Sequence, residues 1–119
     1  MIKQKSRIHG RGIFAERKIP EGKEFYKIPL DNILDHNAPK AAHIGDGLYV
    51  LDEKVLNWVN HSCEPNSAID LDKKMLYALC EIKPGEEITV DYDKTEVEGD
   101  KIPCNCGSRF CKGYFIGLA

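Results

Sequence analysis

Near its middle the chain reads Asn60-His61-Ser62-Cys63-Glu64-Pro65-Asn66. The stretch is polar and turn-forming. The Asn60 amide offers both hydrogen-bond donors and an acceptor, which suits an amino-acid moiety or the edge of an adenine ring. Cys63 lies in the same stretch and is a candidate metal ligand. Taken alone, an Asn-His pair is most often a capped turn, so the meaning of this stretch depends on the rest of the sequence.

The chain has five cysteines, and three of them are clustered near the C-terminus as Cys104, Cys106 and Cys111. This Cys-x-Cys-x4-Cys pattern supplies three thiolates and leaves one position open on a tetrahedral zinc ion. Cys80 alternates with apolar residues in 75–82, which predicts a place in the core of a strand. An odd number of cysteines without a secretory leader favours a metal site over a disulfide framework. The alternative is a set of unrelated thiols.

Two further segments carry candidate functional residues. The first is Gly10-Arg11-Gly12-Ile13-Phe14-Ala15, and the second is Gly85-Glu86-Glu87-Ile88-Thr89-Val90-Asp91-Tyr92. By itself a Gly-x-Gly pair is a plain turn before a strand. A tyrosine that ends a strand is ordinarily half-buried packing with its hydroxyl satisfied. Each segment alone is therefore a weak signal.

Composition limits the class of protein. The 119 residues are 42% hydrophobic and 30% charged, which is a globular balance and favours one domain. No apolar run is long enough for a membrane span, and the N-terminal residues do not form a secretory signal peptide. Either the mature protein starts here inside a cell or a leader has been removed, and an intracellular protein is expected. Residues 1–40 carry a net charge of +4 and residues 41–119 a net charge of −6. The acidic half disfavours a polyanion such as DNA; it indicates either a basic peptide ligand or a solvated acidic edge.

Proline and glycine cut the chain into short pieces, which predicts a mostly β fold with little helix. Turns are expected at 20–22 and 84–85, where a proline followed by a glycine suits a type II turn. Short helical pieces are expected at 39–43 and 52–59, and a charged linker at 93–101. Strands are expected at 13–15, 25–28, 67–71, 75–82 and 88–92, the third and fourth being paired.

Taken together and in this order, the four segments resemble the SET-domain protein lysine methyltransferases that carry a post-SET zinc motif. The resemblance spans residues 7–115. It implies a SET-domain fold of short strands in small sheets with a C-terminal pseudoknot, which would bring Asn60 and His61 beside Tyr92. It further implies a SET domain over 1–93, followed over 94–119 by a linker and a small zinc-bound post-SET tail.

The resemblance also assigns roles to individual residues. Tyr92 matches the catalytic tyrosine of the family, and Tyr49 resembles a tyrosine that lines the lysine channel. One structural zinc ion would be held by four thiolates, those of Cys63, Cys104, Cys106 and Cys111. Trp58 stands where the family often has an aromatic residue, and a core indole is the equal alternative. S-adenosyl-L-methionine would be bound by Gly10, Arg11, Gly12, Asn60, His61, Tyr92, Tyr114 and Phe115.

The implied function is methyl transfer from S-adenosyl-L-methionine to the ε-amine of a lysine in a protein substrate. A basic lysine-containing segment is the expected substrate, since the acidic residues concentrated in 86–100 would attract it; a histone is possible and is not assumed. Neither direct nucleic-acid binding nor a membrane is expected. Two alternatives stay open: a non-catalytic SET-like zinc module for protein interaction, and a zinc module for nucleic acid. Val90 stands where many family members have Phe or Tyr, so the degree of methylation is left undecided.

Overall fold

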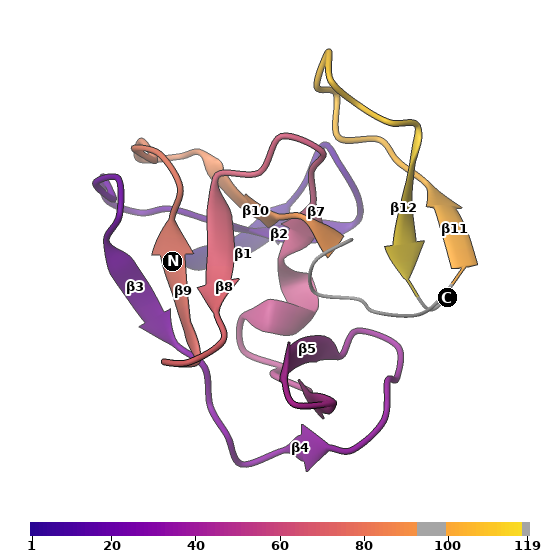
Figure 1. Cartoon of the computed structure of the whole chain (residues 1–119). Coiled ribbons are helices and arrows are strands. Elements are labelled where there is room, and N and C mark those ends of the chain that lie inside the picture. The colour runs from indigo at the N-terminus through magenta and orange to yellow at the C-terminus, as the bar shows by residue number, and fades with distance from the viewer. Residues whose placement is uncertain (93–99, 118–119) are drawn as a thin grey trace.

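A four-stranded sheet lies at the centre of the molecule (Figure 1). The computed structural model describes residues 1–92 and 100–117. The strand order is β1 (Ile2–Lys5), β2 (Arg11–Phe14), β10 (Glu87–Val90) and β7 (Asn60–His61). β10 runs antiparallel to β2 and parallel to β7, so the last of these strands in the sequence lies between two earlier ones. This insertion joins segments that are far apart in the chain.

A second sheet contains β3 (Glu24–Lys27), β9 (Met75–Ala78) and β8 (Ser67–Asp70), in that order. The pairing of β8 with β9 confirms the paired strands predicted from the sequence. The second strand ends at Ala78, earlier than expected, and the chain bends at 79–80. Cys80 is consequently exposed, and its prediction as a strand-core residue was wrong.

A third sheet has the order β4 (Ile33–Leu34), β6 (Leu48–Val50) and β5 (Ala42–Gly45). The helical piece expected at 39–43 is absent from these described residues, because Ala42 and His43 pair with β6 instead. The helix expected at 52–59 is reduced to one 3₁₀ turn, η1 (Leu56–Trp58). The buried Asp52 carboxylate accepts hydrogen bonds from the backbone N–H groups of Lys54 and Leu56, both at 3.1 Å. These local bonds favour a turn over a longer helix.

The core joins the first three sheets through buried aliphatic side chains, among them Ile13, Ile88, Val59 and Leu76. The two predicted proline–glycine turns lie beside this core, with Gly22 at φ 81° and Gly85 at φ 85°. A positive φ is readily adopted only by glycine. Ile19 and Ile82, which precede the two turns, exchange backbone hydrogen bonds of 2.8 Å. The mostly β architecture predicted from the sequence is confirmed.

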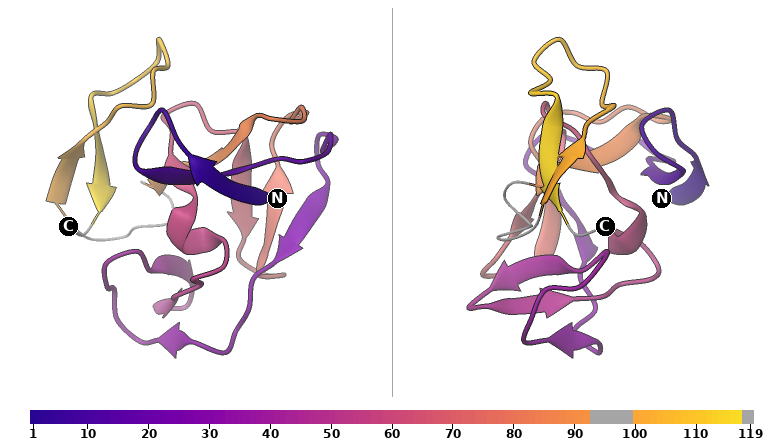
Figure 2. Two further views of the ribbon diagram at one scale, coloured as in Figure 1. Left: turned by 180° about the vertical axis from the view of Figure 1, so that it is seen from behind. Right: turned by 90° about the vertical axis from the view of Figure 1, so that its right-hand side faces the viewer.

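A two-stranded sheet of β11 (Asp100–Pro103) and β12 (Tyr114–Gly117) stands apart from the other sheets (Figures 1 and 2). The expected linker at 93–101 falls largely on residues outside the described ranges, and the division at 93 stays a prediction. No helix among the described residues has the length and apolar character needed to span a membrane.

Candidate functional site

The parallel pairing of β7 with β10 brings Asn60 and His61 beside Tyr92. Asn60 is in register with Thr89, and His61 with Val90. The Tyr92 backbone N–H donates to His61 Nδ1 at 2.9 Å, and the Tyr92 hydroxyl donates to the Val59 carbonyl at 2.5 Å. The structure therefore brings together the three residues that the resemblance placed side by side.

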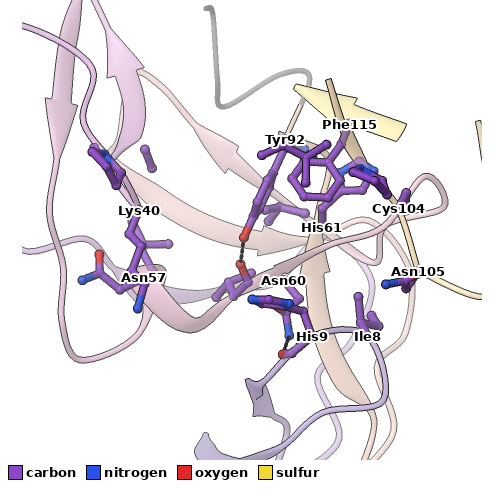
Figure 3. A pocket seen from close by; sticks show the side chains of 18 of the residues that line it. Ile8, His9, Lys40, Asn57, Asn60, His61, Tyr92, Cys104, Asn105 and Phe115 are labelled. Carbon is purple, nitrogen blue, oxygen red and sulfur yellow. Dashed lines mark hydrogen bonds between the residues drawn. The ribbon is translucent and has the colours of Figure 1, made fainter. Parts of the chain in front are cut away.

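These residues border a cavity of about 410 Å³. Figure 3 shows Tyr92 and His61 between Lys40 and Asn57 at one end and Cys104 and Asn105 at the other. Much of the remaining wall is apolar and comes from distant parts of the chain. Its apolar members include Ile8, Pro39, Ala41, Ala42, Leu56, Val59, Ile69, Val90, Ile102, Pro103 and Phe115.

The Asn60 side chain anchors the loop between β1 and β2. Its Nδ2 donates to the carbonyls of His9 (3.0 Å) and Arg11 (3.2 Å) and to Glu87 Oε2 (2.8 Å). The Glu87 carboxylate also accepts from the Ser6 hydroxyl at 2.7 Å. These bonds hold His9 at the cavity wall, where Figure 3 shows it next to Asn60.

Sequence reasoning assigned no role to Glu87 or Ser6. Glu87 lies inside a quoted segment, but its partners come from other strands and cannot be inferred from local pattern.

The segment Gly10-Arg11-Gly12 supports the cavity without lining it. Gly10 has φ 45° at the turn, and the Arg11 carbonyl accepts from Asn60. A Cβ atom built on Gly12 would lie 2.2 Å from Glu87 Oε2 and 3.1 Å from Asn60 Nδ2. The glycine at this position therefore permits the close approach of β2 to the Glu87 carboxylate.

The two aromatic residues of β12 point in different directions, as neighbouring residues of a strand do. Phe115 stacks on His61 with ring centroids 4.8 Å apart and meets the Tyr92 ring edge-on at 5.1 Å. Tyr114 is not among the cavity-lining residues, and the Lys101 ammonium lies 4.5 Å from the centre of its ring. Of this predicted pair, the structure brings Phe115 alone to the cavity.

Tyr49 and Trp58 lie outside the cavity wall as the structure describes it. Tyr49 is buried in β6, and its ring lies 5.2 Å from that of His43. Its assignment to a lysine channel stays a prediction that this geometry does not support. Trp58 is half-buried, with the ammonium groups of Lys3 and Lys40 at 4.2 and 4.3 Å from its ring centre.

The four cysteines proposed as zinc ligands converge at one place. Their sulfur atoms all lie within 4.8 Å of one another, and the Sγ atoms of Cys63 and Cys104 are 3.9 Å apart. Four sulfurs at about 2.3 Å from a tetrahedral zinc ion would be roughly 3.8 Å apart. Cys63 follows β7, whereas Cys104, Cys106 and Cys111 belong to the segment that joins β11 to β12. The cluster therefore ties the C-terminal hairpin to the central sheet.

Three of the four thiols have shifted pKa values. Burial raises the pKa of Cys63, and burial raises the pKa of Cys104 to about 12. Burial also acts on Cys106, but hydrogen bonds from the backbone of Cys63 and Ser108 and from neighbouring thiols lower its pKa to about 6. Zinc binds thiolates. The soft four-sulfur donor set fits a structural zinc ion.

Comparison with known proteins agrees with this geometry. The family model described as "SET domain" matches residues 10–93. The chain is 32% identical to human histone-lysine N-methyltransferase 2B and 34% identical to histone-lysine N-methyltransferase set-2 of Caenorhabditis elegans, over 92% and 96% of its length. These matches cover 5% and 9% of the two relatives. The chain belongs to the SET-domain family.

A solved structure shares the fold. The crystal structure of KRYPTONITE in complex with mCHH DNA, H3(1-15) peptide and SAH superposes with a TM-score of 0.71 at 23% identity. The superposition covers 94% of this chain and 28% of that one. The SET-domain fold implied by the resemblance is thereby confirmed, with β10 inserted between β2 and β7. The chain spans only a small part of the relatives that it matches.

Proposed function

We propose that this chain transfers a methyl group from S-adenosyl-L-methionine to the ε-amine of a lysine in a protein substrate. The observation that carries the proposal is the placement of Tyr92 at the wall of a cavity beside Asn60 and His61. The relatives named above are histone-lysine methyltransferases. A histone tail is therefore the first substrate to test.

The cavity fits a cofactor of this kind. Its volume lies within the range of about 300–1,000 Å³ typical of small-molecule sites. We assign its contacts to Asn60, His61 and Phe115, and to Ile8 and His9 of the loop that Gly10, Arg11 and Gly12 continue into β2. The bound cofactor would supply a sulfonium methyl group that a neutral amine can accept. Tyr114, whose ring meets Lys101, is the least supported member of the predicted set.

Tyr92 would orient the incoming amine. Its phenolic proton is directed to the Val59 carbonyl. The phenolic oxygen keeps lone pairs that can accept an N–H of the substrate amine and so direct the nitrogen lone pair. The ring is itself held by Phe115 and by the backbone bond to His61. Such positioning supplies several kcal/mol of the barrier reduction.

The apolar wall would help to produce the neutral amine. At pH 7 the deprotonation of an ordinary lysine costs about 4–5 kcal/mol. Burial among side chains such as Val59, Val90 and Phe115 disfavours the ammonium form and lowers the pKa of a lysine that enters. We therefore infer that no dedicated general base is required.

The zinc site would hold the C-terminal part of the cavity wall in place. Cys63, Cys104, Cys106 and Cys111 would hold one ion in a four-thiolate site without an open position, which is a structural arrangement. The ion would fix β12, and with it Phe115, against His61. We infer that the activity resides in residues 1–93 and depends on the tail at 94–119 for this part of the wall.

A methyl-transfer assay tests the proposal. The zinc-loaded protein would be incubated with labelled S-adenosyl-L-methionine and a histone mixture, in parallel with Tyr92→Phe and the control Tyr77→Phe. We expect label on lysine, a loss of about 100-fold or more in kcat for Tyr92→Phe, and an unchanged rate for Tyr77→Phe. Cofactor binding by calorimetry without transfer to any protein would support the non-catalytic alternative. Full turnover by Tyr92→Phe would refute the role of the tyrosine.

A further inference from the structure

His61 uses both ring nitrogens to connect two sites. Nδ1 accepts the Tyr92 backbone N–H at 2.9 Å, and Nε2 lies 3.3 Å from the Sγ atom of Cys63. The side chain is only 1% exposed. A single imidazole therefore lies between the proposed catalytic tyrosine and the first cysteine of the metal cluster.

The backbone bond determines which nitrogen carries the proton. A backbone N–H can only donate, so Nδ1 must accept and must lack a proton. The neutral ring then carries its proton on Nε2, which points to Cys63. A sulfur bound to a metal is a thiolate and can only accept a hydrogen bond. The two contacts therefore require the same tautomer and support each other.

Two aromatic rings also pack against the His61 imidazole. Phe115 stacks on one of its faces with an interplanar angle of 27°, and the Tyr92 ring lies 5.4 Å away at 61°. Asp91 Oδ1 approaches Nδ1 no closer than 3.8 Å, beyond hydrogen-bond distance. The orientation of the imidazole is thus set by Cys63, Tyr92 and Phe115.

We propose that His61 is a positioning residue that couples the metal centre to Tyr92: the Cys63 thiolate orients the imidazole, and the imidazole holds the Tyr92 backbone. This inference rests on the proposed function for its catalytic consequence, but the coupling itself concerns only residues of this chain. Hydrogen-bonded neighbours of a metal ligand orient it and tune the metal, and their loss costs about 10- to 100-fold in affinity or activity. The coupling would make the position of Tyr92 sensitive to whether the cluster holds its ion.

Two amide variants separate the two contacts. In His61→Asn the side-chain oxygen takes the place of Nδ1 and keeps an acceptor for the Tyr92 N–H, but the side chain is too short to reach Cys63. In His61→Gln the amide nitrogen takes the place of Nε2 and keeps a donor for Cys63, but no acceptor faces Tyr92. The exposed His36 offers a matched control as His36→Asn.

Three readouts are measured on the metal-loaded protein: metal affinity by chelator competition with Co²⁺, the amide resonance of Tyr92 by NMR, and kcat and KM. For His61→Asn we expect about 10-fold weaker metal binding and a smaller displacement of the Tyr92 resonance than in His61→Gln, since an acceptor for its N–H remains. For His61→Gln we expect metal affinity within about threefold, a displaced Tyr92 resonance, and about 10-fold lower kcat with little change in KM.

The outcome is decisive either way. The coupling is refuted if the two variants alter metal affinity and the Tyr92 resonance to the same extent, or if neither variant alters them, because His61 would then act as packing alone. If the protein transfers no methyl group, the proposed function fails while the metal and NMR readouts still test the coupling. Melting temperatures near that of His36→Asn would establish that both variants fold.

Discussion

Residues 1–92 and residues 100–117 hold their shape by different means. The first region has a core of aliphatic side chains that includes the fully buried Ile13, Ile88 and Leu76. In the second region no residue of 101–116 is buried. A two-stranded hairpin without a core is marginal in water, and this one is fastened by the cysteine cluster. One chain thus relies on apolar burial in its larger part and on a metal site in its smaller part.

Removal of the metal should have the largest effect, and it should be confined to the smaller region. Structural zinc can contribute about 10–16 kcal/mol in small peptides, more than a two-stranded hairpin has of its own. We expect Cys106→Ser, or chelation of the ion, to abolish amide-exchange protection in 100–117 and to abolish methyl transfer, because Phe115 would leave the cavity. The core of 1–92 should remain protected, as hydrogen exchange followed by mass spectrometry would report.

Cys80→Ser is the matched control for this experiment. Cys80 is exposed and is not part of the cluster, so its replacement should leave zinc content and exchange unchanged. If Cys106→Ser had the same zinc affinity and the same exchange protection as Cys80→Ser, the assignment of Cys106 as a ligand would be contradicted.

Truncation of one isoleucine in each region should reveal the difference in packing. Ile88 is fully buried in β10, and Ile88→Ala should lower the free energy of unfolding by about 2–5 kcal/mol because it leaves a cavity. Ile102 is only half-buried in β11, and Ile102→Ala should cost about 1 kcal/mol or less. Urea denaturation of the zinc-loaded variants measures both values. Equal costs would mean that the hairpin shares the core.

The same division explains what could be predicted from the sequence. The short segments that carry Asn60, Tyr92 and the clustered cysteines identified the family and the fold, because their residue types are demanded by chemistry. The turn at Gly85 was predictable from local backbone preference. Features that depend on distant pairing were not predictable in this way.

Three examples show why pairing could not be read from local pattern. β1 reads Ile-Lys-Gln-Lys, all exposed, and is a strand because it pairs with β2. The segment at 39–43 has a local pattern compatible with a helical turn, yet Ala42 and His43 pair with β6 and so belong to a sheet. The hairpin of β11 and β12 has no core that would leave a hydrophobic period.

Gly12→Ala should have an intermediate effect, confined to the densely packed region. The new methyl group would collide with the Glu87 carboxylate, which Ser6 and Asn60 hold in place. We expect a loss of about 1–3 kcal/mol, since displacement of the carboxylate breaks hydrogen bonds to a charged group. In the hairpin, by contrast, a Cβ on Gly113 would meet nothing within 4 Å, and the cost of a side chain there would come from its φ of 87° alone.

A double-mutant cycle isolates this collision. In a Glu87→Ala background the closest contact is gone and only Asn60 Nδ2 at 3.1 Å remains near the added methyl group, so Gly12→Ala should cost much less in thermal denaturation. Additive losses in the double variant would show that the cost at Gly12 has another origin than the carboxylate.

Alkaline pH should act more weakly, and through the larger region, at Tyr26 of β3. Burial raises the pKa of Tyr26 above its ordinary value of 10.0, and the 2.6 Å hydrogen bond to Asp52 is the second largest cause of this increase. Above that pH the unfolded chain loses the phenolic proton while the folded chain retains it, so stability falls as pH rises through this window. Tyr26→Phe removes this hydrogen bond, so its free energy of unfolding at pH 7 should be lower by about 1 kcal/mol. The variant should also lack this alkaline decline. Denaturation of the unmodified protein and of Tyr26→Phe at pH 8 and at about pH 10.5 measures the loss of stability in each. Equal losses in the two proteins would assign the alkaline decline to groups other than Tyr26.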